Sequence, residues 1–218
     1  MTGPRRGLPT TRLVGTMPKL LDLFSCAGGA GMGYHRAGFE VVGVDIRPQP
    51  NYPFEHHVGD AIEFVREHGH EFDAIHASPP CQAYSITRHM HTKDHPDLVE
   101  PTRAALIETG RPWIMENVPG APMLDYVTLC GSMFGLTAVD TDGELLALRR
   151  HRLFESNVFM LSAGSCVHDR TRVAGVYGGG AVSKERRSTT TGRRVGYTPH
   201  KAIAEQLLGI DWMTLDEC

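Results

Sequence analysis

The sequence predicts an α/β fold: a mostly parallel sheet with helices on both faces. Two observations carry this prediction. From Lys19 to Glu116, short apolar runs typical of buried strands alternate with segments whose apolar residues have helical spacing, and the connections between them are short. The length of 218 residues suits one domain with a small appendage and is ample for a hydrophobic core. Such alternation is typical of βαβ units, in which neighbouring strands run parallel.

The elements follow one another in a regular order as far as residue 125. Strands are expected at 19–24, 40–46, 72–77 and 112–116, and helices at 30–37, 60–67 and 97–109. Shorter strand-like runs follow at 127–131, 152–154, 158–161 and 173–177. A last helix is expected at 199–208, because Pro199 suits the first position of a helix and Gly209 suits its end. Residues 1–16 lack hydrophobic periodicity and are expected to form a flexible extension, so that Met17 could be the true start.

Composition excludes few functions. The net charge of −3 argues neither for nor against nucleic acid, because the distribution of charge decides binding. The five cysteines are odd in number, widely spaced and without a Cys-x-x-Cys pair, so they indicate thiols of a reducing compartment, not a disulfide frame or a zinc site. No apolar run approaches 18 residues and no apolar signal core precedes the fold, which predicts a cytoplasmic protein.

The stretch from Ala77 to Gln82, Ala-Ser-Pro-Pro-Cys-Gln, is the most informative in the chain. It follows the apolar run 72–77, so Cys81 should lie on a proline-stiffened loop at the carboxyl end of a strand, where open α/β sheets place their chemistry. A thiol there can act as a nucleophile if its surroundings lower its pKa. Taken alone, a buried structural cysteine is the simpler interpretation.

A glycine-rich turn, Asp22-Leu-Phe-Ser-Cys-Ala-Gly-Gly-Ala-Gly-Met-Gly33, follows the first strand. Glycines allow a tight turn and a close approach to a ligand, and the next helix offers free N–H groups. The spacing is not Gly-x-Gly-x-x-Gly, so a pyrophosphate site is weakly supported. Asp45, at the end of the second strand, is placed to hold ribose hydroxyls. Together these features favour an adenosine-containing ligand.

Two further segments carry ionisable side chains. Glu116 leaves an apolar strand near the Cys81 loop, where poor solvation should raise its pKa enough for the carboxyl to donate a proton near neutrality. Alternatively, Glu116 caps a turn. In Leu148-Arg-Arg-His-Arg-Leu-Phe154, side chains two apart share a face, so Arg150 and Arg152 could hold a carbonyl oxygen and a phosphate, or form an exposed basic edge.

The segment 178–194 is rich in glycine, serine and threonine and strongly basic. It is either a solvated surface loop or a contact to phosphates. Its cations are Lys184, Arg186, Arg187, Arg193 and Arg194, against the acid Glu185.

These segments together resemble the C5-cytosine DNA methyltransferases, in particular compact, phage-borne members. Asp22-Leu-Phe-Ser-Cys-Ala-Gly-Gly resembles the family's cofactor loop, Ser78-Pro-Pro-Cys-Gln its nucleophile motif, Glu116-Asn-Val its acid motif and Arg150-His-Arg152 its paired-arginine motif. All four occur in family order within residues 19–155, and their joint match is far more specific than any single motif. The resemblance implies a Rossmann-like, S-adenosylmethionine-dependent methyltransferase fold with a minimal recognition insert.

The resemblance also implies a reaction. Cys81 would add to C6 of a cytosine flipped out of double-stranded DNA, and the activated C5 would take the methyl group of S-adenosylmethionine. Glu116 would bind the exocyclic amine and protonate N3. Arg152 would hold O2, and Arg150 would support the loop or a phosphate. No metal enters this mechanism.

Binding residues follow from the same resemblance. The expected cofactor site consists of Phe24, Gly28, Gly29, Asp45, Ile46, Asp60, Ala61 and Pro80. Phe24 would stack on adenine, and Asp60 would bind its amine. The expected DNA contacts are Gln82, Tyr84, Ser85 and Arg88, at the start of a closing loop, and the basic residues Arg186, Arg187, Arg193 and Arg194.

The chain departs from the family pattern at three places. Cys26 stands where the family usually has glycine, and Leu148 where it often has glutamine. The family's terminal motif, which completes the cofactor pocket, is not found before Cys218. The chain could therefore be truncated, a natural fragment, or one of two chains that form the enzyme. The expected organisation is a cofactor-binding and catalytic domain at 17–154, a reduced target-recognition region at 155–197 and a C-terminal helix at 198–218.

Other functions and a metal site remain alternatives. His89, His91 and His95 lie in one loop without cysteine or carboxylate partners, and Cys166-Val-His168 has no evident second pair to complete four ligands, so no metal is expected. RNA is an alternative substrate, and a non-catalytic DNA- or cofactor-binding remnant is an alternative role. Amino-methyltransferases are disfavoured, because their Pro-Pro motif ends in an aromatic residue where this chain has Cys81. A bacterial or phage-infected cytoplasm and a restriction-modification context would fit the family.

Overall fold

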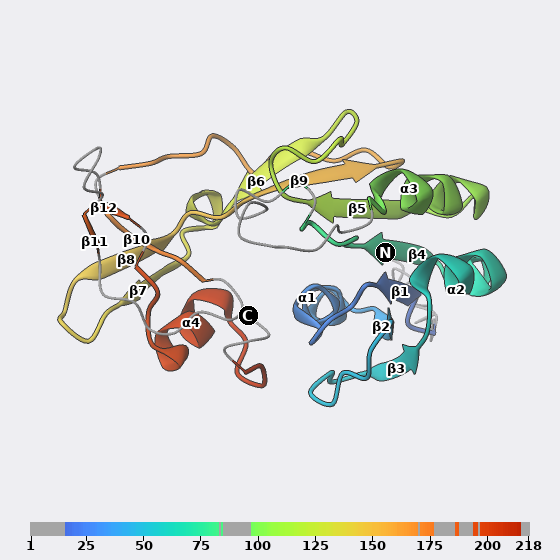
Figure 1. Ribbon diagram of the computed structural model, residues 1–218, viewed down its shortest axis with the longest axis horizontal. Helices are drawn as coiled ribbons and strands as arrows, with labels where there is room; N and C mark the ends of the chain where they lie inside the picture. The colour runs from blue at the N-terminus through green and yellow to red at the C-terminus, as the bar shows by residue number, and fades with distance from the viewer. Residues whose placement is uncertain are drawn as a thin grey trace, which may run out of the picture.

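The computed structural model describes residues 16–82, 84, 97–169, 171–176, 186–187, 194–195 and 197–214. Its main sheet has seven strands in the order β3-β2-β1-β4-β5-β9-β6 (Figure 1). The first five run parallel, whereas β9 runs antiparallel to both β5 and β6. The strands are β1 (Lys19–Leu23), β2 (Glu40–Asp45), β3 (Glu55–Val58), β4 (Ala74–Ala77), β5 (Trp113–Asn117), β6 (Val127–Cys130) and β9 (His151–Ser156). A Rossmann-like, mostly parallel sheet is therefore confirmed.

The two faces of this sheet differ in chemistry. Side chains alternate along each strand, so one face carries Leu21, Leu23, Ile75 and Met115, which share a core with α2 (Ala61–His68) and α3 (Val99–Glu108). The opposite face carries Asp22 and His76, against which α1 (Gly29–Arg36) packs. One face is thus an apolar support, and the other presents polar side chains.

A buried ion pair joins α3 to β9 on the apolar face. Arg103 donates from Nε and Nη2 to the two carboxylate oxygens of Glu155, at 2.6 and 2.9 Å. Arg103 also donates to the carbonyl oxygen of Pro122, and Glu155 accepts from the backbone N–H of Leu124. Because both charges are paired and hydrogen-bonded, their burial is tolerated, and the loop after β5 is held in place.

A smaller body lies beside the main sheet, and its first two strands come between β6 and β9 in the chain (Figure 1). Its three-stranded sheet, in the order β10-β8-β7, shares an apolar core with α4 (Lys201–Leu208). Its strands are β7 (Thr137–Val139), β8 (Leu145–Leu148) and β10 (Arg172–Ala174). A two-stranded hairpin of β11 (Arg186–Arg187) and β12 (Arg194–Val195) and the 3₁₀ turns η1 (Gly69–Glu71) and η3 (Gly131–Phe134) complete the described elements.

Several predicted elements need correction. Strands β3, β7 and β8 were not predicted, because β3 is a largely exposed polar edge strand and β7 and β8 are too short for a clear pattern. The predicted strand at 158–161 is wrong: this stretch is irregular, with Phe159 and Leu161 exposed. Helix α4 begins at Lys201 rather than Pro199, with His200 as its N-cap. Among the described helices, none has the length and apolarity needed to span a membrane.

Candidate active site

The order of the strands places a site between β1 and β4. The sheet is extended in opposite directions from these two neighbours, and in such sheets ligands bind beyond the carboxyl ends of the strands at this switch point. The loops after β1 and β4 are joined there: the Ser78 hydroxyl donates to the carbonyl oxygen of Phe24 at 3.3 Å, and the Ser78 N–H donates to that of Leu23 at 3.2 Å. The glycine-rich loop and the Ser-Pro-Pro-Cys loop therefore lie side by side.

The glycine-rich loop is tightly wound. Phe24, Cys26 and Gly28 all have positive φ angles, of 57°, 44° and 89°, in the left-handed region that favours glycine. The ring of Tyr52 lies against the loop, and a Cβ added at Gly28 would come within 2.9 Å of it. The Tyr52 hydroxyl donates to Asp22 at 3.1 Å. Tyr52 thus packs against the loop and stabilises its conformation, a role that no sequence motif indicated.

Asp45 helps to fix the same loop. Its Oδ2 accepts from the N–H of Cys26 at 3.0 Å, and its Oδ1 accepts from the N–H of Arg47 at 3.1 Å. Each carboxylate oxygen can accept a further hydrogen bond, so a ribose contact remains possible chemically. Asp60 has a clear local role, because its Oδ1 caps α2 by accepting from the N–H groups of Ile62 and Glu63.

A cavity of about 310 Å³ opens beside the glycine-rich loop. Of the predicted cofactor residues, Phe24 and Gly29 line it, whereas Gly28, Asp45, Ile46, Asp60, Ala61 and Pro80 do not. Its lining consists of Phe24, Ser25, Cys26, Ala27, Gly29, Ala30, Ser78, Arg150, Leu208, Ile210 and Met213. The last three belong to α4 and the segment after it.

The C-terminal segment is held against the glycine-rich loop by specific contacts. The Trp212 indole N–H donates to the carbonyl oxygen of Ala27 at 2.8 Å, and Arg36 of α1 donates to that of Gly209 at 2.6 Å. Ile210 and Met213 share a small buried cluster with Ala27. Sequence reasoning missed these residues, because nothing local in 208–213 indicates a partner nearly 190 residues earlier.

A second cavity, of about 570 Å³, lies on the polar face of the sheet. It contains Glu116, Arg150 and Arg152, which the sequence predicted to act together. The Nε of Arg152 lies 2.6 Å from Oε1 of Glu116. Burial raises the pKa of Glu116, although the charges of Arg152 and Arg150 oppose that shift, so the predicted direction is confirmed. Arg150, Ser78 and Ala30 line both cavities, which therefore adjoin.

Cys81 lies on the loop after β4, half-buried, and is not among the lining residues of either cavity. Asn117 anchors this loop: its Nδ2 donates to the carbonyl oxygen of Pro79 at 3.1 Å, and its Oδ1 accepts from the N–H of Val118. The acid segment Glu116-Asn-Val is thus tied directly to the Pro-Pro-Cys segment. A buried asparagine at a strand end could have suggested this positioning role.

Cys26 is poorly suited to be a nucleophile. Desolvation by burial and the nearby Asp45 and Asp22 carboxylates raise its pKa to about 11, so the thiol stays protonated at neutral pH.

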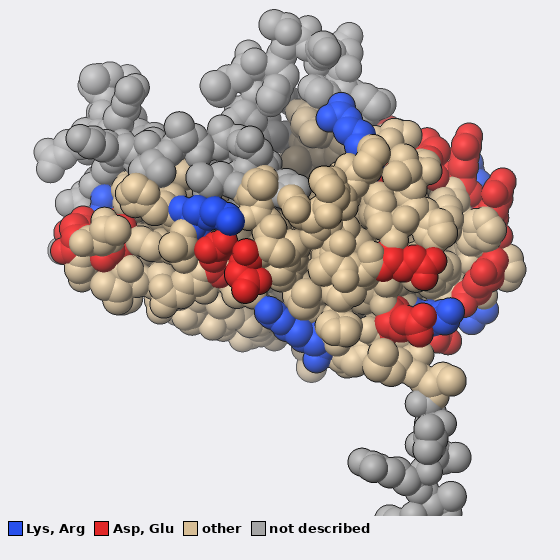
Figure 2. Space-filling view, turned by 90° about the horizontal axis from the view of Figure 1, so that it is seen from below, with Lys and Arg blue, Asp and Glu red and all other residues tan. Residues whose placement is uncertain are grey.

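The predicted DNA contacts are only partly described. Gln82 and Tyr84 are half-buried, and Ser85, Arg88 and Arg193 lie outside the described residues, as does the histidine-rich loop 89–95. For Arg186, Arg187 and Arg194 the backbone alone is described, and it forms the β11–β12 hairpin. On the face shown in Figure 2, described side chains of both charge signs are interspersed.

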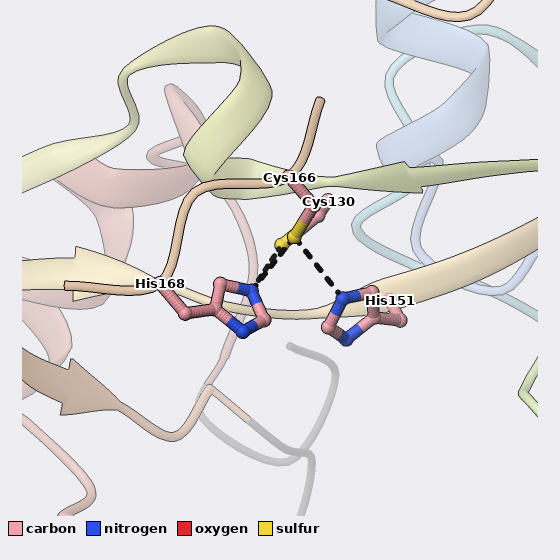
Figure 3. Close-up of side chains that lie close together, drawn as sticks. All are labelled: Cys130, His151, Cys166 and His168. Carbon is pink, nitrogen blue, oxygen red and sulfur yellow. Dashed lines mark hydrogen bonds between the residues drawn. The ribbon is translucent and has the colours of Figure 1, made fainter. Parts of the chain in front are cut away.

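The prediction that Cys166 and His168 lack a second pair of ligands is wrong. The fold brings Cys130 and His151 to them, and the four ligating atoms lie within 4.8 Å of one another (Figure 3). Sequence spacing could not show this, because Cys130 and His151 are not neighbours in the chain.

Comparisons with known proteins identify the first half of the chain. A family model described as C-5 cytosine-specific DNA methylase matches residues 18–125. Among curated proteins, no sequence matches.

Several solved structures share a distant likeness. A SAM dependent methyltransferase from Agrobacterium tumefaciens is 15% identical over 66% of this chain and 57% of its own, with a TM-score of 0.35. The S. pombe Dnmt2 methyltransferase is 14% identical over 66% of this chain and 52% of its own, with a TM-score of 0.41. A SAM dependent methyltransferase from Archaeoglobus fulgidus is 11% identical over 65% of this chain and 86% of its own, with a TM-score of 0.41. The matched part therefore spans little more than half of the first two chains, and such TM-scores carry no argument about chemistry. The family match covers the segment that holds the glycine-rich loop, Cys81 and Glu116, and this segment is similar to the C-5 cytosine-specific DNA methylases.

Proposed function

We propose that the chain is an S-adenosylmethionine-dependent methyltransferase that methylates C5 of cytosine in double-stranded DNA. The observation that carries this proposal is the pair of adjoining cavities at the switch point of the sheet. One is bounded by the glycine-rich loop, the other holds the Glu116–Arg152 ion pair, and Arg150 lines both. Methyl transfer needs such an arrangement, because the methyl donor and the acceptor carbon must be held about 3–3.5 Å apart.

The first cavity suits the cofactor. Its volume lies at the lower end of the roughly 300–1,000 Å³ typical of small-ligand pockets. Phe24 offers an aromatic face to adenine, and the free N–H groups at the start of α1 suit a carboxylate. Asp45, which already positions Cys26, would accept from the ribose hydroxyls. When bound, S-adenosylmethionine supplies an electrophilic methyl group.

The C-terminal segment would complete this pocket. Leu208, Ile210 and Met213 occupy the side where the family's terminal motif is expected. We infer that this segment, rather than a second chain, closes the methionine side of the site.

The second cavity suits a flipped cytosine. The Cys81 thiolate would form a bond to C6, and the displaced ring electrons would move toward C5 while Glu116 protonates N3. Burial raises the pKa of the Glu116 carboxyl, a shift that favours its role as a proton donor. C5 would then take the methyl group. Loss of the C5 proton to water, expulsion of the Cys81 thiolate and return of the N3 proton to Glu116 would restore the ring.

Arg152 would serve two partners in this reaction. Its guanidinium holds Glu116 and has further N–H groups for the cytosine O2. Since Cys81 stands outside the lining of the second cavity, its loop would have to move toward the base when DNA binds.

A covalent trapping experiment tests the proposal. The purified chain, given S-adenosylmethionine and a DNA duplex with 5-fluorocytosine, should form an adduct stable to denaturation, because fluorine cannot leave C5 as the proton does. Cys81→Ala should lose the adduct and at least about 10³-fold in methyl transfer. The matched control Cys218→Ala should keep both.

The same experiment separates the alternatives. An adduct with a 5-fluorocytosine RNA but none with DNA would reassign the substrate, and methyl transfer by Cys81→Ala would refute the covalent mechanism. Binding of DNA or cofactor without turnover or adduct would indicate a non-catalytic remnant.

A further inference from the structure

Four side chains that can bind metals converge at the edge of the main sheet, and none of them lines either cavity (Figure 3). Cys130 is the last residue of β6, His151 is the first of β9, and Cys166 and His168 lie in the irregular stretch after β9. Three separate segments of the chain therefore contribute ligands. Convergence of this kind is typical of a site built for a ligand rather than of a local sequence accident.

Strand register, a tertiary feature of the fold, explains how the first pair forms. Cys130 and His151 are direct partners in the antiparallel pairing of β6 with β9, so their side chains emerge on the same face. Cys166 and His168 are two residues apart, which in an extended segment also gives a common face. The fold then brings the two cysteine–histidine pairs together.

The distances match a tetrahedral site closely. The Nε2 of His151 lies 3.3 Å from the Cys166 sulfur, and the Nε2 of His168 lies 3.5 Å from the Cys130 sulfur and 2.7 Å from that of Cys166. With Zn–S of about 2.3 Å and Zn–N of about 2.0 Å, the edges of a tetrahedral site are roughly 3.3–3.8 Å long. Of these three edges, the Cys166–His168 edge is the one that must lengthen, and the irregular segment that carries both residues can adjust.

We propose that Cys130, His151, Cys166 and His168 bind one Zn²⁺ ion. Two thiolates and two neutral imidazoles are a donor set that favours zinc, and the two thiolate charges would balance the ion. Both histidines turn Nε2 toward the sulfurs, which leaves Nδ1 to carry the proton. With four protein ligands the site is closed, so the ion is structural and not catalytic.

The surroundings support thiolate ligands. The Ser132 hydroxyl lies 3.3 Å from the Cys130 sulfur and 3.4 Å from the Cys166 sulfur. A hydroxyl between two metal-bound thiolates can donate to either, and such outer hydrogen bonds orient the ligands.

The position of the site suggests what it stabilises. Residues 157–169 form no helix or strand, and they expose Val158, Phe159, Leu161 and Val167, so little apolar burial holds this stretch. A zinc ion would fix it to the sheet. His151 also lies between Arg150 and Arg152, whose side chains line the second cavity. The ion would therefore anchor the start of β9 and with it the segment that holds both arginines. The effect on the arginines rests on the proposed function, whereas zinc binding itself does not.

Metal analysis of the full chain tests the inference without DNA or cofactor. Protein purified under reducing conditions should contain about one zinc ion per chain by inductively coupled plasma mass spectrometry. Replacement by Co²⁺ should give the visible bands of a tetrahedral site and a thiolate-to-metal charge-transfer band. His168→Asn should lose most of the zinc, since a ligand from an exposed position is removed with little risk to folding.

Two matched variants make the result specific. His168→Cys retains four ligands and should keep the zinc, and His70→Asn, at an exposed histidine outside the cluster, should keep it too. Full zinc in His168→Asn, no zinc in the wild type, or a Cys130–Cys166 disulfide in protein isolated without reductant and free of zinc would each overturn the inference.

Discussion

At the scale of single residues, Asp22 shows how the polar face of the sheet differs from the apolar one. It is fully buried beneath α1, where desolvation raises its pKa to about 7, although hydrogen bonds from Tyr52 and Gly31 act in the opposite direction. In the unfolded chain its pKa returns to about 3.9. Asp22 is therefore a carboxyl that the fold prefers to keep protonated.

This preference predicts a pH dependence of stability. Between about pH 4 and pH 7 the folded state holds a proton on Asp22 that the unfolded state has lost, so the free energy of unfolding falls as pH rises, by about 1.4 kcal/mol per pH unit. Asp22→Asn removes this pH-dependent contribution to the free energy of unfolding. Relative to the wild type, the variant should gain about 3 kcal/mol between pH 5 and pH 7, measured by urea unfolding.

His76 also changes its pKa on folding, so the pH dependence must be measured as the difference in stability between the wild type and Asp22→Asn. Burial lowers its pKa to about 4, so its contribution to stability rises with pH from about 4 to 6.5, with the opposite sign. The contribution is common to both proteins and cancels in the comparison. A difference between the two proteins that stays constant with pH would contradict the buried, protonated Asp22.

At the scale of elements, the turn between β1 and α1 combines function with strain. Cys26 has a φ angle of 44°, where a side chain costs roughly 1–2 kcal/mol relative to glycine. The family usually has glycine at this position, and the structure gives the physical reason. The chain tolerates the cost because Asp45 holds the Cys26 N–H and Tyr52 supports the turn.

We expect Cys26→Gly to stabilise the protein. Relief of the strained φ angle outweighs the greater freedom of glycine in the unfolded chain, so the free energy of unfolding should rise by about 1 kcal/mol in denaturant titrations. Cys26→Ala is the matched control, since alanine keeps the strain and should bring no such gain. Equal stability of the two variants would show that this turn is not strained at Cys26.

At the scale of the whole molecule, the C-terminal segment packs against the glycine-rich loop near the N-terminus. The smaller body of β7, β8, β10 and α4 has its own core, and the segment after α4 reaches across to the glycine-rich loop. Two hydrogen bonds and a small apolar cluster make this contact. The first cavity therefore exists only when both bodies are assembled, because Leu208 and Ile210 form one of its walls.

Loss of the Trp212 hydrogen bond should weaken cofactor binding. Trp212→Phe keeps most of the packing but no longer donates to Ala27, and a hydrogen bond worth about 1 kcal/mol corresponds to roughly fivefold in the dissociation constant. Calorimetric titration with S-adenosylmethionine measures it. The exposed Tyr126, changed to Phe, serves as the control. Unchanged affinity in Trp212→Phe would show that the C-terminal contact does not shape the pocket.

By itself, the sequence determined what depends on neighbouring residues. Alternating apolar runs predicted the parallel core strands and their helices, and strand ends located the glycine-rich loop, Cys81 and Glu116, because burial patterns and turn chemistry are local properties. Side chains two apart placed Arg150 and Arg152 on one face, and both line the second cavity.

Tertiary structure decided what depends on segments distant in the chain. The pairing of β6 with β9 sets Cys130 opposite His151, and Asn117 holds the Pro79 carbonyl. Leu208, Ile210 and Met213 line the first cavity. Strand register and docking of the C-terminal segment result from the packing of the entire chain. No local pattern encodes them, which is why four potential zinc ligands look unrelated in the sequence and meet only in the fold.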